Sequence, residues 1–552
     1  MLSYRKLAMR VLSCPLHTGR GIDSPRPASQ RAAAFILTAA MLTTLAAPAF
    51  AGTWYIEDGN ITISAGTEAG TNKVEQAGKD TVDNDKDTII TNQNKDKASS
   101  NTVTIDAGSD KVEVTLQDVN IKADSGSALT SKGDVTLTLK GDNHLTGGIS
   151  GTGNYGRNGI ASTGSLTISG GENDSLTAQG GSGADGSYGG HGIYSNGSLT
   201  ISGGTVNANG GDGSNVNGSG ISSNGSVTIS GGTVNATGGN GSHGGNGIYS
   251  RSSLTISGGT VNATGGSGED GGDGIRSFDP VAISGGTVTA KGGSGEDGSG
   301  GRGIYSIKSV TISGGTVNAN GGNSTNSSGG YGISSLDVAI SGGTVTANGG
   351  DSKDGYGGDG IHSNDIDLSG SLELTAKAGS PNGKALSQNG RELDLNAIKD
   401  KLGPGAKVTA TDANGETKQV SIPRPVEPEG PVIPGDSSSS SDGGSAAPSA
   451  PAFSLPGLTV TDKDGQRISY TSTQSGNTLT VCVGRFTASF RISLAALRQL
   501  RAEGIETITF QTILCSTTLS VDELLAMGGE DAEVVLTHHI RSSTLTVGGK
   551  AV

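Results

Sequence analysis

Residues 192–211 read GIYSNGSLTISGGTVNANGG, and close copies of this segment follow one another along the middle of the chain. Apolar and polar side chains alternate in it, as in Leu199-Thr200-Ile201 and Thr205-Val206-Asn207-Ala208. A period of two predicts strands with one buried face, and each run is too short for a helix. With Gly192-Ile193-Tyr194-Ser195, each copy predicts three short strands separated by Gly and Asn.

The copies keep a constant register. Two markers recur in step, the first residue of Ile-Ser-Gly-Gly-Thr-Val at Ile201, Ile229, Ile256, Ile283, Ile312 and Ile340, and a Gly-Ile pair at Ile193, Ile221, Ile248, Ile275, Ile304, Ile333 and Ile361. Successive motifs lie 27 to 29 residues apart, and the variation in length falls in the loop after Thr-Val-Asn-Ala-x-Gly-Gly. One copy cannot bury its apolar face alone, but stacked copies place Ile on Ile and Val on Val. The sequence therefore predicts an all-β fold, a parallel β-helix with about 28 residues per rung.

Outward positions of the predicted strands are also repeated. Thr follows each Gly-Gly corner, and Asn recurs at Asn207, Asn235, Asn262 and Asn318. Stacked polar side chains of one kind form hydrogen-bonded ladders along a stack. We expect these ladders to stabilise the β-helix.

The composition agrees with a thin core. Of 552 residues 96 are Gly, whereas the hydrophobic set makes up 32% and aromatic residues 3%. This balance argues against an enzyme built around one thick core, and the lack of a strict three-residue period argues against collagen. We expect the glycines at the corners of the rungs, where positive φ is needed, and in the variable loop.

Changes of composition divide the chain into six segments. A basic flank, an apolar run over residues 32–45 and Ala49-Phe50-Ala51 predict a secretory signal peptide that is cleaved before Gly52. The predicted segments are a signal peptide with a long n-region (1–51), an N-terminal cap with irregular first rungs (52–135), regular β-helix repeats (136–379), a transitional segment (380–421), a Pro/Ser/Gly linker (422–456) and a small α+β domain (457–552).

The net charge restricts the classes of partner that the protein can bind. Six Lys/Arg and one Asp precede Gly52, so 32 basic and 51 acidic residues remain after cleavage, a net charge of −19. Such a protein is a poor nucleic-acid binder, because phosphate contacts need a positive surface. No later run is long and apolar enough for a transmembrane helix. We expect an extracellular or cell-surface protein.

The C-terminal domain has an ordinary composition. Five strand-like runs alternate with two helices, one capped by Ser493 and one by a Ser520/Glu523 capping box. Cys482 and Cys515 can pair in an oxidising compartment or stay free, and the sequence does not decide between these states.

Acidic loops suggest a metal. Gly-Gly-x-Gly-x-Asp occurs three times and ends at Asp185, Asp270 and Asp297, and Glu269 and Glu296 precede the last two. Carboxylates on neighbouring rungs repel each other, and calcium would relieve that repulsion with oxygen ligands. The alternative interpretation is a solvated acidic loop without a metal.

The residue after each Gly-Ile pair points outward. Its series includes Tyr194, Tyr249, Arg276, Tyr305 and His362. Aromatic side chains in one row can stack against sugar rings. The alternative is that Tyr occurs there because it favours strands.

Three stretches carry a family resemblance: WYIEDGNITI at 54–63, VTLQDVNI at 114–121, and the repeated Gly-Ile-Tyr-Ser and Ser-Leu-Thr-Ile-Ser-Gly-Gly-Thr. Together the chain over about residues 53–376 resembles exported bacterial right-handed parallel β-helix proteins of the carbohydrate-binding-domain type. The resemblance implies a fold like that of polysaccharide lyases, and ligands such as acidic plant polysaccharide or cellulose, with calcium in some members.

We therefore expect a non-catalytic polysaccharide-binding protein with an acidic plant or cell-surface glycan as ligand. Two alternatives stay open, a structural or adhesive surface protein with a repeat stalk, and a polysaccharide lyase. The lyase is disfavoured because the basic residues that it would need as a catalytic base are scattered one per rung.

Overall fold

The computed structural model describes residues 52–150, 155–183, 188–423, 458–462, 467–468, 470–475, 477–483, 487–512, 516–527, 532–538, 543–548 and 550–551. The chain forms two compact units, residues 1–428 and 429–552, which are described separately.

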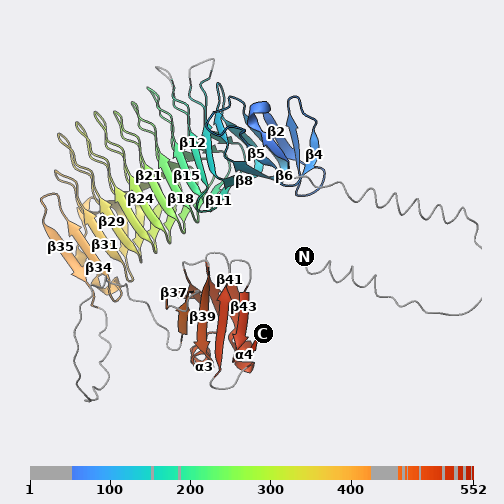
Figure 1. Cartoon of the computed structure of the whole chain (residues 1–552). Coiled ribbons are helices and arrows are strands. Elements are labelled where there is room, and N and C mark those ends of the chain that lie inside the picture. Colours follow the sequence, from blue (N-terminus) through green and yellow to red (C-terminus); the bar gives the residue numbers. More distant parts are fainter. Residues whose placement is uncertain are drawn as a thin grey trace, which may run out of the picture. The chain divides into compact units, whose positions relative to one another are not determined.

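The first unit is a parallel β-solenoid in which each turn contributes three strands (Figure 1). The first strands are β10 (Ile160–Ser162), β13 (Ile193–Ser195), β16 (Ile221–Ser223), β19 (Ile248–Ser250), β22 (Ile275–Ser277), β25 (Ile304–Ser306) and the beginnings of β28 (Ile333–Ile340) and β30 (Ile361–Leu368). The second are β11 (Leu166–Gly170), β14 (Leu199–Ile201), β17 (Val227–Ile229), β20 (Leu254–Ile256), β23 (Val281–Ile283), β26 (Ser309–Ile312) and the ends of β28 and β30. The third are β12 (Ser175–Gln179), β15 (Thr205–Asn209), β18 (Thr233–Thr237), β21 (Thr260–Thr264), β24 (Thr287–Lys291), β27 (Thr316–Asn320), β29 (Thr344–Asn348) and β31 (Glu373–Lys377).

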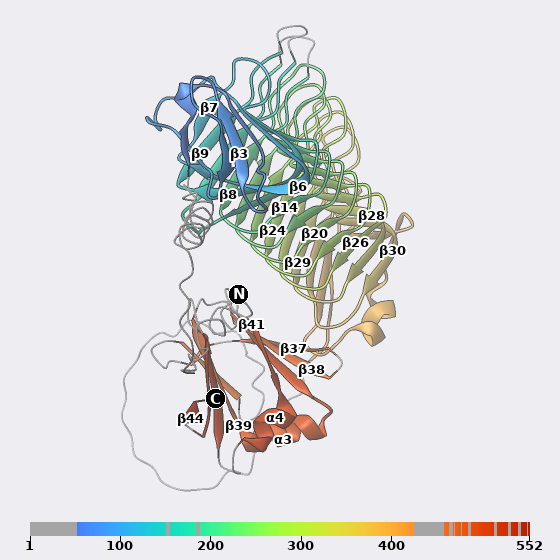
Figure 2. The ribbon, with the colours of Figure 1, turned by 90° about the vertical axis from the view of Figure 1, so that its right-hand side faces the viewer.

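Parallel pairing between turns confirms the predicted register. Ile193 pairs with Ile221, Ile201 with Ile229, and Val206 with Val234, and the same pattern continues along the stack. These side chains are fully buried and form one continuous core. Figure 2 shows the successive strands side by side from a second direction.

The predicted Asn ladder is confirmed over Asn207, Asn235 and Asn262, whereas Asn318 lies between Thr289 and Thr346. The Nδ2 of Asn235 donates to Oδ1 of Asn207 at 2.8 Å, and the Nδ2 of Asn262 donates to Oδ1 of Asn235 at the same distance. Each of these hydrogen bonds therefore joins the side-chain amides of two successive turns.

Glycine has two different tasks in the solenoid. At the Gly-Gly corner the prediction of positive φ is confirmed, as at Gly204, where φ is 75°. The loop after the third strand follows another rule. A Cβ on Gly211 would collide with the carbonyl oxygen of Gly181, and one on Gly218 with that of Gly190, so close backbone approach, not positive φ, excludes side chains there.

These loop glycines bond to one another in an unbroken series, which we call the glycine spine. Each N–H donates to the carbonyl oxygen of the preceding member at 2.7–3.0 Å, alternately within a loop and between turns. The members are Gly181, Gly190, Gly211, Gly218, Gly239, Gly245, Gly266, Gly272, Gly293, Gly301, Gly322, Gly330, Gly350, Gly358 and Gly379. The spine binds the two legs of every loop, so the loops stand beside one another along one side of the solenoid (Figure 1), and their length varies only beyond it.

Irregular elements cover the N-terminal end. They are β1 (Thr53–Tyr55), the 3-10 helix η1 (Ile56–Asp58), β2 (Ile61–Ala65), β3 (Asn72–Gln76), β4 (Val82–Asp85), β5 (Ile89–Thr91), β6 (Val103–Gln117), β7 (Asn120–Lys122), β8 (Leu129–Lys140) and β9 (Asp142–Thr146). β2, β3 and β4 pair antiparallel, whereas β1, β5 and β6 already pair in parallel.

The stack continues beyond residue 379. β32 (Leu386–Gln388) pairs in parallel with β30, and β34 (Lys407–Thr411) with β31. Antiparallel partners, β33 (Arg391–Glu392) and β35 (Thr417–Ser421), follow them, and η2 (Leu395–Lys401) lies between. An antiparallel hairpin at a sheet edge interrupts the template for further parallel strands.

The second unit has two small sheets and two short helices, as predicted. The first sheet contains β36 (Leu458–Thr461), β39 (Ala488–Ser493), β42 (Glu533–His538), β43 (Ser543–Val547) and β44 (Lys550–Ala551). The second contains β37 (Thr471–Ser475), β38 (Thr478–Cys482), β40 (Thr507–Gln511) and β41 (Ser516–Ser520). The helices are α3 (Leu494–Ala502) and α4 (Val521–Ala526), capped by Ser493 and Ser520 as expected. Across the described residues, no helix has the length and apolar character needed to cross a bilayer.

Candidate functional site

The residues that follow the Gly-Ile pairs form one row on the surface, which we call the outward file. Its members are Ala161, Tyr194, Ser222, Tyr249, Arg276, Tyr305, Ser334 and His362, and each pairs with the next across adjacent first strands. Alternation in a strand places the preceding Ile and the following Ser inside and this residue outside. The structure therefore brings all five sequence-predicted residues together.

Aromatic side chains occupy alternate turns of this file. Tyr194, Tyr249 and Tyr305 follow one another two turns apart, and His362 lies two turns beyond Tyr305. All four are half-buried, whereas Ser222 is 5% exposed between its two larger neighbours. The rings are thus held in place and keep part of their surface in solvent.

A second row lies beside the outward file and was not foreseen from the sequence. It consists of the residues before each Gly-Ile pair, which are Asn158, His191, Ser219, Asn246, Asp273, Arg302, Tyr331 and Asp359, and we call it the flanking file. Short side chains in it accept a hydrogen bond from the backbone N–H of the next turn, for example Asn246 Oδ1 from Asp273 at 3.0 Å. The recurrence of a polar residue before each Gly-Ile pair was the sequence signal that could have predicted this second row.

The two files meet around Tyr305. The guanidinium of Arg302 lies 4.0 Å from the centre of the Tyr305 ring and that of Arg276 lies 5.3 Å from it. Asp273 holds the Arg276 side chain and the Arg302 backbone, since its carboxylate accepts from Arg276 Nη1 at 3.3 Å and from the Arg302 backbone N–H at 2.8 Å. Burial raises the pKa of the Asp273 carboxyl, and the two arginines oppose this shift. A cavity of about 330 Å³ adjoins this cluster.

A second cavity, of about 490 Å³, adjoins Tyr194 and Tyr249. Asn224 Nδ2 donates to the hydroxyl of Tyr194 at 2.9 Å, and His191 stacks against the same ring at 5.8 Å. Burial disfavours the charged ring and lowers the pKa of His191 to about 4. Its Nδ1 accepts a hydrogen bond from the Ser219 N–H at 2.9 Å. His191 is therefore a neutral acceptor at neutral pH.

His362 closes the far end of the outward file. Its ring stacks on Tyr331 at 4.4 Å, and its Nδ1 lies 2.7 Å from Asp359 Oδ2. Burial alone would raise the pKa of the Asp359 carboxyl, but its hydrogen bonds with His362 and the Lys384 N–H bring that pKa below its usual value. The end of the file is thus an ordered stack of ring and carboxylate.

The acidic loops lie on neighbouring turns, since Gly268 bridges to Gly295, but their carboxylates have separate partners. Asp270 lies 2.9 Å from His243 Nδ1, and Asp297 accepts from Asn326 at 2.8 Å. Asp185 lies outside the described residues. Among the described residues, no three His, Cys, Asp or Glu side chains gather where they can hold a metal ion. The described carboxylates of these loops therefore do not converge in this structure, and calcium binding stays a prediction.

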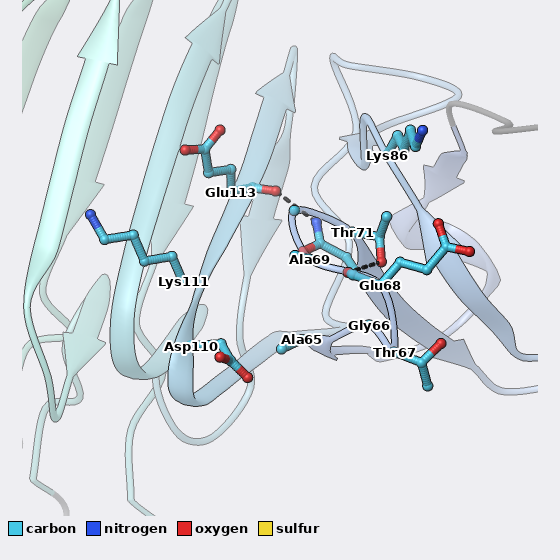
Figure 3. A pocket seen from close by; sticks show the side chains of 12 residues that line it. Ala65, Gly66, Thr67, Glu68, Ala69, Thr71, Lys86, Asp110, Lys111 and Glu113 are labelled. Atoms are coloured by element: carbon cyan, nitrogen blue, oxygen red, sulfur yellow. Dashed lines mark hydrogen bonds between the residues drawn. The ribbon is translucent and has the colours of Figure 1, made fainter. Parts of the chain in front are cut away.

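A cavity of about 600 Å³ lies at the N-terminal end, between the β2–β3 turn and the bend of β6. Charged residues line it, but Figure 3 shows that the ends of Glu68, Asp110 and Glu113 point in different directions. This cavity therefore offers no converging set of donors.

The cysteines leave the predicted pairing untested. Cys482 Sγ lies 3.6 Å from Oε1 of Gln511, and Cys515 lies outside the described residues. The pairing stays a prediction.

A family described as Beta helix repeat matches residues 199–225, 227–246, 254–275, 281–304, 310–335 and 338–365. These segments of the solenoid are similar to beta helix repeats. Each matched segment begins at or next to the second strand of one turn and runs through the loop, so the match follows the structural period. No curated protein and no solved structure matches the chain. The match supports the repeat and the solenoid, and it does not show a carbohydrate-binding or lyase family.

Proposed function

We propose that this beta helix repeat protein is exported and binds an extended polysaccharide along the outward file without cleaving it. The observation that carries the proposal is the recurrence of Tyr194, Tyr249 and Tyr305 on alternate turns. Neighbouring turns lie about 4.8 Å apart, so alternate rings recur at about 10 Å. That distance is of the order of a disaccharide unit in an extended glycan, and each ring can therefore meet an equivalent sugar.

The polar groups beside the rings indicate the chemistry of the ligand. Arg276 and Arg302 flank Tyr305 and present guanidinium groups, which bind carboxylates well. Asp273 holds the Arg276 guanidinium and anchors the Arg302 backbone, so the Arg276 side chain loses little freedom on binding. An acidic plant or cell-surface glycan fits this combination.

Binding without cleavage is favoured because the aromatic rings recur on alternate turns and no catalytic set of side chains is assembled in one turn of the file. A lyase or hydrolase needs one constellation of nucleophile, acid and base, whereas the file offers one side chain per turn. Calcium, if it binds, would have to rearrange the acidic loops so that the carboxylates around Glu269 and Glu296 converge on the ion.

The test is affinity electrophoresis of the mature protein through gels that contain acidic or neutral polysaccharides. We expect retention by an acidic glycan, and a loss of about two- to tenfold in affinity for Tyr249→Ala and for Tyr305→Ala, since a ring contact contributes about 0.5–1.5 kcal/mol. Tyr356→Ala is the matched control, because Tyr356 is 67% exposed and lies outside the file.

Four results decide against parts of the proposal. Failure of every glycan to retain the folded protein contradicts binding, and an equal loss in the Tyr356 variant contradicts the role of the file. Release of unsaturated uronate products establishes a lyase instead. If EDTA leaves the retention unchanged, calcium has no role in glycan binding.

The glycine spine favours a second candidate, a structural or adhesive stalk. Its uninterrupted hydrogen bonds run from Gly181 to Gly379 and tie every loop to the next, as expected of a rigid spacer. A folded protein that binds no glycan but positions the C-terminal unit for adhesion would support the stalk.

A further inference from the structure

A carboxylate is buried at the start of the solenoid. Asp85, at the end of β4, is 0% exposed, and three groups donate hydrogen bonds to it. The backbone N–H of Gly52 donates to Oδ1 at 2.7 Å, and the indole Nε1 of Trp54 and the hydroxyl of Thr88 donate to Oδ2 at 3.1 and 3.0 Å. Trp54 and Thr88 are themselves buried.

The hydrogen bonds fit an ionised carboxylate. The Thr88 hydroxyl receives a hydrogen bond from Asn72 Nδ2 at 2.9 Å, so its own proton is directed to Asp85. With three donors, the carboxyl group acts only as an acceptor. Within the described part of the chain, no Lys, Arg or His side chain forms an ion pair with Asp85, and the nearby Lys79 bonds to Asp58 at 2.8 Å. A buried charge without an opposite charge is costly, so a cation placed at one of these donors would stabilise the carboxylate.

Gly52 is held tightly against the carboxylate. Its carbonyl oxygen accepts from the Ile89 N–H at 2.9 Å, which continues the pairing of β1 with β5. A Cβ at position 52 would collide with Asp85 Oδ2 and would lie 2.5 Å from Trp54 Nε1, so only glycine fits. The nitrogen of Gly52 is therefore fixed beside Asp85.

We infer that the α-amino group of Gly52, once freed by cleavage of the Ala51–Gly52 bond, forms a buried ion pair with Asp85 and locks the first turn of the solenoid. The inference rests on the proposed export, because a leader peptidase performs the cleavage. Water adds across the peptide bond, its hydroxyl going to the Ala51 carbonyl carbon and its hydrogen to the Gly52 nitrogen. The amine then takes a proton from solvent, since an α-amino group has a reference pKa of about 8.

Processing and folding are linked in this way. Before cleavage, Asp85 has only neutral donors, and the first turn carries an uncompensated charge. After cleavage, the ammonium supplies the opposite charge at an atom already in place. Among the described residues no turn precedes the first one, so extra stability there protects this end of the stack.

The test combines two chain starts with two residues at position 85. One chain begins at Gly52 and the other keeps one alanine before it, and each is made with Asp85 and with Asp85→Asn, from fusions cut directly before the desired residue. In the Asp85 chain that begins at Gly52, we expect the α-amine to react with an acylating reagent at least about tenfold more slowly than in the Asp85→Asn chain. The extra alanine should speed hydrogen exchange at Ile89 in the Asp85 background and leave it unchanged in the Asp85→Asn background.

Equal effects of the alanine in both backgrounds, or an α-amine that reacts equally fast in both, would overturn the ion pair. The mass of the exported protein tests the cleavage separately, because a chain that begins elsewhere than Gly52 overturns the processing step. Glycan retention is measured independently, so failure of the ion pair and failure of the proposed function are different results.

Discussion

Replacing Gly218 by alanine tests the glycine spine. The new methyl group would collide with the carbonyl oxygen of Gly190, which accepts from the Gly211 N–H at 2.7 Å. Gly218 itself donates to Gly211 at 3.0 Å and accepts from Gly239 at 2.8 Å, so relief of the collision weakens three adjacent hydrogen bonds. At about 1 kcal/mol for each bond, with a further cost for polar groups left unpaired, we expect a loss of about 3–5 kcal/mol.

The control is Gly126→Ala. Gly126 has a φ of 86°, but a Cβ there meets nothing within 4 Å, so only the left-handed backbone opposes the change. That strain costs about 1–2 kcal/mol. The comparison therefore separates steric exclusion from conformational strain.

Calorimetry of the mature chain measures both variants. With an unfolding entropy of about 2 cal/mol/K per residue over a solenoid of about 370 residues, Gly218→Ala should lower the Tm by about 4–6 °C and Gly126→Ala by about 1–3 °C. Hydrogen exchange should accelerate mainly in the turns around Gly218. A Tm loss in Gly218→Ala no larger than in Gly126→Ala would refute the steric account of the spine.

Two further predictions concern polar groups in the stack. Asn235→Ala should cost about 1–2 kcal/mol in chemical denaturation, because it removes the bonds to Asn207 and Asn262; a neutral result would mean that the ladder contributes nothing. His191 has a pKa of about 4 in the fold against 6.5 in the unfolded chain, so its contribution is complete above about pH 6.5 and is lost as the pH falls towards 4, by up to about 3 kcal/mol. His191→Gln can still accept from the Ser219 N–H and should flatten the dependence of Tm on pH in this window, whereas an unchanged slope would place its origin elsewhere.

Much of the fold could be predicted, because the constant spacing of the repeat shows which residues of successive turns stack on one another. The constant step from Ile201 to Val206 and the recurring Gly-Ile pair place each buried side chain on its counterpart. The loops could not be predicted in the same way. Their glycines indicated turns, but the collision that a side chain on Gly218 would make involves Gly190 of the preceding turn, and no local pattern shows it.

The candidate site was predictable only in part. Alternation placed Tyr249 and Tyr305 on the surface, and the pairing of the turns confirms one row. The flanking file was not predicted from the sequence, because Asn246, Asp273 and Arg302 differ in chemistry and share only their position before Gly-Ile. Their common role, a hydrogen bond to the next turn or a contact across it, depends on three-dimensional neighbours.

Surface loops usually absorb sequence change, since they contact little. In this protein the glycine spine reverses that rule along the legs of the loops, where any replacement of a member such as Gly266 introduces atoms into space already filled by the backbone of Gly239. Mutational tolerance should therefore be lowest in segments that a composition-based reading would call linkers, and highest at the loop tips only a few residues away. Selection on such a chain acts against almost every amino-acid change at these glycines, and new chemistry can arise without loss of the fold mainly at the tips and along the outward file.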